Sequence, residues 1–261
     1  MTTLVRVELL KLRTTRLTFG LLATAGSLTV LFSVLEAARA GGKVIAPLST
    51  AAGQNAVITG GIWALIFAAV LGVTASSGEF RHATATQTYL ASPRRGRVLA
   101  AKAVAGAIGG AVYGLAGWVI ATGVCLGFVS ADGYQVQIGD ATMVRYAAGH
   151  VLAGALMAAL GVGLGSLIRS QLASVIGVFI WAIVIESIIG GLFNTVQPYL
   201  PYTAATTLSG SVLGGAAFGP ANGAASSASA LPFAAAAALL AGVAAAVAAV
   251  AATTTVGRDI S

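Results

Sequence analysis

Charged side chains are scarce in this sequence. Only 8% of its 261 residues are Asp, Glu, Lys or Arg, whereas soluble domains carry about 25%. So few charges cannot cover the surface of a soluble domain, and 57% of the residues are hydrophobic. The composition therefore argues against a soluble enzyme and indicates one integral membrane domain over residues 1–261.

Residues that bind metals or form disulfides are equally scarce. The single cysteine, Cys125, lies in an apolar run and has no second thiol with which to form an internal disulfide. The two histidines, His82 and His150, belong to no Cys/His cluster in the sequence. We therefore expect no metal site, and we assign no catalytic residue.

A phosphate-binding motif is also missing. No Gly-x-x-x-x-Gly-Lys-Ser/Thr loop occurs, so we expect the chain to bind no ATP in this way and to hold no cofactor of its own. The run from Gly161 to Gly165 resembles a nucleotide-binding glycine string, but it lies inside an apolar stretch with no strand before it. We interpret it as a surface for close helix contact, like other glycine pairs at this spacing. The pairs are Gly110 and Gly114, Gly123 and Gly127, and Gly161 and Gly165.

What the sequence does have is long apolar stretches. A hydrocarbon core of about 30 Å needs about 20 helical residues. The stretches that meet this length are 17–35, 55–76, 103–129, 146–168, 172–193 and 231–256. The last is Ala-rich and weakly apolar, and Pro232 suits its first turn. The first exceeds the apolar region of a signal peptide, about 7–15 residues, so we expect it to be retained. We predict an all-α membrane protein with six transmembrane helices.

Basic residues gather beside alternate ends of these stretches. The net charge is +7, and with the N-terminus inside, 11 of the 14 Lys and Arg residues fall on the cytoplasmic side. They are Arg6, Lys11, Arg13, Arg16, Arg81, Arg94, Arg95, Arg97, Lys102, Arg169 and Arg258, whereas Arg39, Lys43 and Arg145 fall outside. The positive-inside rule then places both termini in the cytoplasm. Because membrane orientation explains the basic charge, we expect no nucleic-acid partner.

Residues 1–16 have the pattern of an interfacial amphipathic helix on the inner leaflet. Leu and Val alternate with charged residues at helical spacing between Leu4 and Arg13. The alternative is a charged flank that only orients the first membrane helix.

The cytoplasmic segment 77–102 is longer than a simple turn. Residues 78–97 of this segment are polar but keep three aromatic or large apolar side chains, and Gly78 and Pro93 punctuate them. A short helix that starts after Gly78 would place Glu79 at its N-terminus, where a negative charge is favourable. Lying against the membrane, this helix would present a surface to a soluble partner. The alternative is an ordinary charged loop.

The same segment resembles the first cytoplasmic loop of ABC type-2 transporter permeases, the membrane subunits of bacterial ABC exporters whose ATPase is a separate chain. The similar motifs are Gly-Glu-Phe-Arg-His-x-Thr at 78–84 and Ser-Pro-Arg-Arg-x-Arg-Val-Leu-x-x-Lys at 92–102. Glu-Leu-Leu-Lys-Leu-Arg at 8–13 resembles the family's N-terminal interfacial helix, and Gly-Ser-Leu-Ile-Arg-Ser at 165–170 resembles the junction of its fourth and fifth spans.

Two later features also fit this family: Glu186, and Leu-Pro-Tyr-Thr-Ala-Ala at 200–205. The resemblance extends in order over nearly the whole chain. Ala83 departs from it, because Gly is expected there.

The resemblance implies a permease subunit of an ATP-driven exporter in the bacterial cell membrane. A coupling helix within 77–102 would dock on a separate ABC ATPase subunit, which uses the ATP. A second permease copy or a paralogue would pair with this chain across a translocation path in the lipid bilayer. The residues that would contact the ATPase are Glu79, Phe80, Arg81, His82, Thr84, Tyr89 and Arg94.

Glu186 stands out within the fifth apolar stretch, about seven residues from its outer end. A charge at this depth costs on the order of a few kcal/mol. We therefore expect the carboxyl group to be protonated, paired or facing a polar translocation path, with Arg145 as one candidate partner. The alternative is a side chain that reaches back to the outer surface.

Segment 194–230 is too polar and too interrupted to cross the membrane as a plain helix. It is rich in Gly, Ser, Ala and Thr and contains Pro198, Pro201 and Pro220. The family resemblance suggests a short re-entrant helix that caps an outer gate. The alternative is a flexible exterior loop.

Three other functions compete with the exporter subunit. A secondary transporter or channel would need more polar spans or paired broken helices, and the sequence signals neither. An intramembrane enzyme would need several converging polar groups, whereas Glu186 is the one acid well inside a span and His150 lies near a helix end. The third is a structural scaffold.

Overall fold

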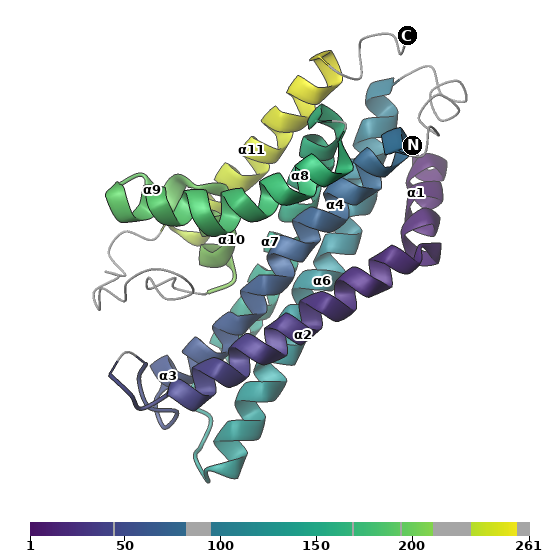
Figure 1. The fold of residues 1–261 in the computed structure, drawn as a ribbon. Helices are drawn as coiled ribbons and strands as arrows, with labels where there is room; N and C mark the ends of the chain where they lie inside the picture. The colour runs from purple at the N-terminus through teal and green to yellow at the C-terminus, as the bar shows by residue number, and fades with distance from the viewer. Residues whose placement is uncertain (44, 82–94, 169, 194, 211–230, 255–261) are drawn as a thin grey trace.

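The computed structural model describes residues 1–43, 45–81, 95–168, 170–193, 195–210 and 231–254. In these residues the regular structure is helical (Figure 1), apart from one isolated bridge between Ala40 and Ile45. Six helical stretches in this part of the chain are long and apolar enough to cross a membrane. The prediction of an all-α membrane protein with six spans is therefore confirmed at this level.

The helices follow one another in a simple order. Helix α1 (Thr2–Thr14) precedes the first span, which is α2 (Arg16–Arg39). The second span consists of α3 (Ala51–Ile58), η1 (Thr59–Ile62) and α4 (Trp63–Arg81), and the third span is α6 (Arg95–Ala131). The remainder are α7 (Asp140–Ile168), α8 (Gln171–Phe179) with η2 (Ile180–Ile185) and α9 (Glu186–Leu192), then η3 (Gln197–Tyr199), α10 (Pro201–Leu208) and α11 (Phe233–Thr254).

All six predicted stretches coincide with these spans, but two spans are not continuous α-helices. The second contains the 3₁₀ turn η1, and the fifth contains the π-helical turn η2. The sixth span begins at Phe233, so Pro232 precedes its first turn, where the Pro232 carbonyl oxygen accepts a hydrogen bond of 2.9 Å from Ala236 N–H. Apolar runs thus locate the spans, while the helices continue past the charged residues at their ends.

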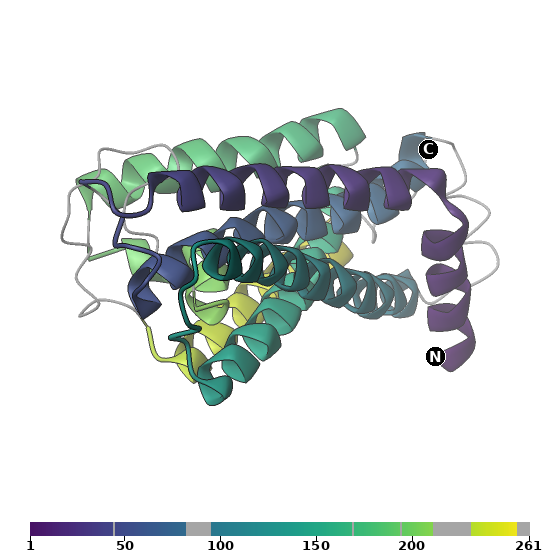
Figure 2. The ribbon, with the colours of Figure 1, turned by 90° about the horizontal axis from the view of Figure 1, so that it is seen from below.

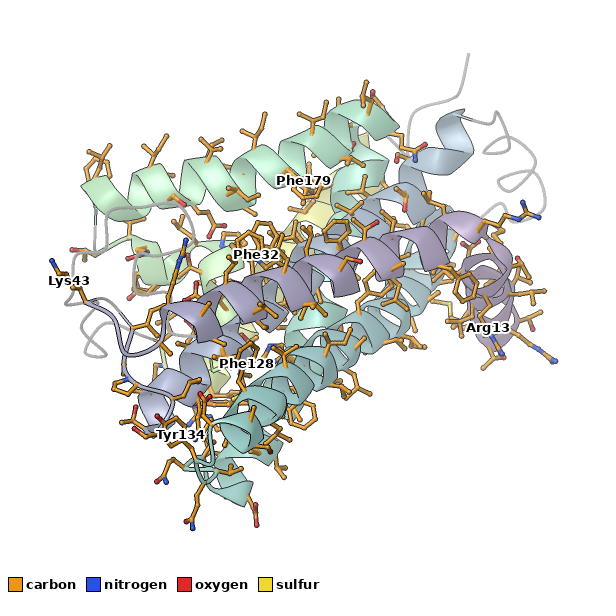
Figure 3. All side chains as sticks on the ribbon, turned by 60° about the horizontal axis from the view of Figure 1, so that its bottom comes forward. Arg13, Phe32, Lys43, Phe128, Tyr134 and Phe179 are labelled. Carbon is orange, nitrogen blue, oxygen red and sulfur yellow. The ribbon has the colours of Figure 1, made fainter. Side chains whose placement is uncertain are left out.

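The long helices run alongside one another, so the bundle has two ends. Figure 3 places Arg13 at one end and Lys43 and Tyr134 at the opposite end. We name these the α1 end and the α3 end. Helices α1 and α2 are not collinear: α1 lies across the α1 end of the bundle (Figure 2). The change of direction occurs at Thr15, whose backbone is extended and whose hydroxyl donates to Lys11 O at 2.6 Å.

The second span is the centre of the bundle. In the most apolar 18-residue stretch of this span, 89% of the residues are buried within the protein. Its helix α4 packs against α2, α6, α7 and α8. Phe67 of α4 meets Phe179 of α8 edge to face, with ring centroids 5.7 Å apart. Trp63 stacks on Phe32 of α2 at 4.4 Å. Figure 3 shows Phe32 and Phe179 in the region between α2 and α8.

Close helix contacts occur at two of the three predicted glycine pairs. A Cβ added to Gly110 would collide with the Gly154 carbonyl of α7, and one added to Gly161 would collide with the Ala69 carbonyl of α4. The third pair, Gly123 and Gly127, has no atom within 4 Å of an added Cβ. The interpretation of this third pair as a packing surface is therefore not met within this chain, because these glycines are exposed and face away from its neighbouring helices.

Apolar burial falls into two main clusters. The first surrounds α4 and includes residues of α2, α6, α7, α10 and α11. The second lies at the α3 end and consists of Ala37, Leu48, Val57, Ile58, Cys125, Val129 and Ile138. Cys125 is a buried free thiol in this second cluster.

Candidate functional site

Glu186 lies where the fifth span changes its winding. The six residues before it form the π-helical turn η2, and Glu186 begins α9. π-Helical turns are rare and often mark functional positions. The residue is 3% exposed, so it does not reach back to a surface as the alternative interpretation required.

Four hydrogen bonds hold the Glu186 carboxylate. Trp181 Nε1–H and Tyr202 N–H each donate to Oε1 at 2.8 Å. Thr203 donates twice to Oε2, from its N–H at 2.8 Å and from its hydroxyl at 3.0 Å. Glu186 is therefore anchored by hydrogen bonds from its own span and from the segment after it. Arg145 is not its partner, and instead places its guanidinium carbon 6.0 Å from the Tyr146 ring centroid.

The carboxylate acts as the N-terminal cap of α10. This helix starts with Pro201, and Leu200 before it offers no capping side chain. The first N–H groups of a helix lack intrahelical partners and form its positive end. Glu186 supplies the missing acceptor from another helix, and hydrogen bonds to a carboxylate are stronger than neutral ones.

The other end of α10 is held as firmly. Gly149 of α7 lets the Leu208 carbonyl approach so closely that an added Cβ would collide with it. Asn55 of α3 donates from Nδ2 to Gly210 O at 3.4 Å. Segment 194–230 thus contains a short helix joined to α3, α7, α9 and α11. That this helix enters the membrane as a re-entrant cap stays a prediction, and residues 211–230 lie outside the described part.

A second polar centre lies at the α1 end. Glu8 of α1 accepts hydrogen bonds from Lys102 Nζ of α6 at 2.9 Å and from Lys11 Nζ at 2.7 Å. Lys102 is only 4% exposed and Glu8 is 8% exposed. Tyr113 of α6 also donates its hydroxyl to Thr18 O at 2.5 Å. A buried ion pair and a partly buried hydrogen bond therefore bind α1 and the start of α2 to α6.

The predicted coupling residues are divided between two parts of the chain. Glu79, Phe80 and Arg81 are the last three residues of α4. The expectation that Glu79 starts a new helix is wrong, because α4 continues through Gly78. The remaining residues, His82, Thr84, Tyr89 and Arg94, lie in residues 82–94, which are outside the described part of the chain.

Sequence reasoning missed the partners of both centres. Lys102 was counted as a loop charge, although Glu8 is the only acidic residue before Glu36 and so the natural partner for a buried lysine near the N-terminal helix. It also missed Gln54 of α3, which donates to Leu48 O and Gln135 O and accepts from the Gln137 N–H. An amide that ends up buried in a loop contact gives no periodic signal.

Comparison with protein-family models, with curated proteins and with solved structures finds no match. Among the described residues, no three His, Cys, Asp or Glu side chains gather as a metal site would require. The contacts of Glu186 and of Glu8 hold helices together. The features that bear on function are thus the helical architecture and these two polar centres.

Proposed function

We propose that this chain is the membrane permease subunit of an ATP-driven exporter. It works with a separate ABC ATPase subunit, which binds the ATP, and pairs with a second permease copy or a paralogue. The observation that carries the proposal is the buried Glu8–Lys102 pair, with 2.9 Å between Nζ and Oε2. It joins the transverse helix α1 to α6, whose first turns form the end of segment 77–102.

The architecture at the α1 end supports this proposal. Six spans bring α1 and the end of α11 to the same end of the bundle (Figure 1). The end of α4 and the start of α6, which are the two ends of segment 77–102, also lie there. A force applied to that segment would act on α4, the most buried span, and on α6, which carries α1 through Lys102. This is the mechanical connection that a subunit driven by an external ATPase requires.

The α1 end is the cytoplasmic side in this proposal. Arg13 lies there, while Lys43 lies at the opposite end (Figure 3), in keeping with the excess of basic residues predicted inside. Helix α1 lies in the interface, with Val7 and Leu10 exposed so that they can enter the lipid.

Reporter fusions test this orientation. Fusions after Ser92 and after Gly257 are expected to report the cytoplasm, and a fusion after Gly139 the exterior of a bacterial cell membrane. A cytoplasmic signal at Gly139 would contradict the orientation.

Purification from native membranes in mild detergent tests the partnership. A subunit that carries the Gly-x-x-x-x-Gly-Lys-Ser/Thr loop is expected to accompany the tagged chain, and the chain stripped of it to hydrolyse no ATP. Replacing Glu79 and Arg81 together by Ala should reduce the recovered ATPase without reducing membrane insertion. The matched control is Lys43→Ala at the opposite end. Full recovery of a coupled ATPase with the double variant would refute the docking assignment.

A second candidate function is a secondary transporter, and one observation favours it. Spans two and five hold corresponding positions in two halves of three spans, and these are the spans interrupted by η1 and η2. Paired interrupted helices often line the binding site of secondary transporters. Solute flux driven by an ion gradient, in vesicles that contain this chain and no ATPase, would favour this function over the exporter subunit.

A further inference from the structure

Five buried polar atoms lack a hydrogen-bond partner among the described residues. They are Thr29 Oγ1, Ser33 Oγ, Trp118 Nε1, Thr122 Oγ1 and His150 Nε2. Thr29, Ser33 and His150 are fully buried, and Thr122 is 8% exposed. Buried polar groups in native proteins nearly always have a partner, and a group within a membrane bundle cannot find one in bulk water. These five atoms therefore require hydrogen-bond partners other than the described side chains and backbone.

The 3₁₀ turn η1 is the centre around which these groups gather. A Cβ added to Gly60 would collide with Ser33 Oγ of α2. One added to Gly61 would lie 2.9 Å from His150 Nε2 of α7 and 3.1 Å from the carbonyl oxygen of Gly117, the residue before Trp118 of α6. Because η1 has no side chains at these two positions, groups from three helices reach its backbone.

The same groups lie at one level of the bundle, between the two apolar clusters. On α2, Thr29 and Ser33 separate Ala25 of the first cluster from Ala37 of the second. On the second span, Gly60 separates Ile62 of the first cluster from Ile58 of the second.

The other two helices repeat this order. On α6, Trp118 and Thr122 follow Tyr113 of the first cluster, and the Trp118 ring packs on the second cluster. On α7, His150 lies between Ala153 of the first cluster and Tyr146, which packs on the second. Four neighbouring elements thus replace apolar residues by polar ones or glycine at one level. We call Thr29, Ser33, Gly60, Gly61, Trp118, Thr122 and His150 the polar layer.

The chemistry of the polar layer fits a small neutral ligand that both donates and accepts hydrogen bonds. His150 Nδ1 lies 2.9 Å from Tyr146 O, so this nitrogen carries the hydrogen and Nε2 is an acceptor. Trp118 Nε1–H is a donor only, and the three hydroxyl groups both donate and accept. The layer contains no carboxylate and no Lys or Arg, so nothing in it would hold a strongly charged ligand.

We propose that the polar layer binds a cluster of water molecules inside the bundle. Internal water makes two to four hydrogen bonds to buried polar groups, and water commonly completes the hydrogen bonding where a membrane helix departs from α geometry. The cluster supplies partners for the hydroxyl groups, the indole and the imidazole. It divides the bundle into two dry apolar parts joined by a hydrated level.

Radiolytic hydroxyl-radical labelling of the intact protein tests the proposal, because radicals formed from bound water oxidise the side chains next to it. Trp118 and His150 are expected to be oxidised several-fold faster than Trp63 and Tyr113, which are buried in the first apolar cluster. Oxidation of Trp118 and His150 no faster than Trp63 would overturn the proposal.

Removal of single hydroxyl groups identifies the ligands of this water. Thr29→Val and Thr122→Val keep the shape of the side chain, and each is expected to slow the oxidation of Trp118 several-fold while leaving Trp63 unchanged. Each should also lower the melting temperature, since the water loses a partner. The control is Thr24→Val on the exposed face of α2, where the hydroxyl already donates to Gly20 O at 2.9 Å. Unchanged Trp118 oxidation together with a raised melting temperature in both variants would show unpartnered hydroxyl groups in a dry site.

Discussion

Glu8 and Glu186 are both buried acids, but the protein satisfies them in different ways. Glu8 pairs with two lysines, one on its own helix and one on α6. Glu186 has no Lys or Arg partner in the described part of the chain, and accepts four hydrogen bonds from uncharged donors. The first arrangement joins two helices by charge, whereas the second fixes the start of a short helix by capping it.

This difference shows where in the bundle each kind of contact is energetically favourable. An ion pair between long flexible side chains can form near the end of the bundle, where Lys102 precedes the apolar part of α6. There Lys11, whose side chain is 46% exposed, offsets part of the desolvation penalty of Glu8 as a second cation. Within the fifth span, backbone N–H groups at a helix start are already in place and lose no side-chain entropy. Two backbone donors, one hydroxyl and one indole therefore replace a cation.

The largest expected effect comes from Glu186→Ala. It leaves the N–H groups of Tyr202 and Thr203 and the indole N–H without an acceptor, and each unsatisfied group costs about 1–3 kcal/mol. We expect the free energy of unfolding to fall by about 4 kcal/mol in a denaturant titration. Glu186→Gln keeps the shape and one acceptor, so its loss should be clearly smaller. Equal stability of both variants and the parent would show that the cap is idle.

A smaller loss is expected when the ion pair is broken from the α6 side. Lys102→Met removes one partner of Glu8 but leaves Lys11, so we expect about 2 kcal/mol rather than the 3–5 kcal/mol of a fully orphaned charge. In the double variant with Glu8→Gln, the loss should be less than the sum of the two single losses. Strict additivity in this double-mutant cycle would mean that the two residues do not interact.

The smallest effect is expected from Trp181→Phe. It removes one of the four donors to Glu186 and leaves the aromatic ring, which is 42% exposed to the surroundings. The loss of one hydrogen bond to a charged group is worth about 1.5 kcal/mol. In the Glu186→Ala background the same change should cost nothing, because the acceptor is already absent. A loss of the same size in both backgrounds would assign the role of Trp181 to packing instead.

The spans were predictable from the sequence because they depend on a local property, the length of an apolar run. The interruptions were not, although Gly60 and Gly61 occur together in span two. Glycine is common throughout this chain, and the adjacent pair Gly109 and Gly110 lies inside the continuous helix α6, so adjacent glycines alone do not mark an interruption such as η1. Only the three-dimensional arrangement distinguishes them.

The polar centres were predictable in part. The apolar surroundings of Glu186 indicated that it needs partners, but those partners are 16 and 17 residues further along the chain. One local sign was present: Pro201 suits the first position of a helix, and Leu200 before it cannot cap one. A helix start without its own cap requires an acceptor from elsewhere, and Glu186 is the nearest preceding acid. Lys102 lies among the basic residues of segment 77–102, so its sequence surroundings predict an exposed side chain, whereas the fold buries it.

The length of α6 makes this helix a lever. It has 37 residues, and at 1.5 Å per residue it extends about 55 Å, nearly twice the thickness of a hydrocarbon core. A tilt of about 10° about its midpoint would displace each tip by about 5 Å. Lys102 lies near one tip and Gln135, bound by Gln54, just beyond the other. A small rotation started by α1 would thus displace the loop at the far end of the molecule by the same distance, in the opposite direction.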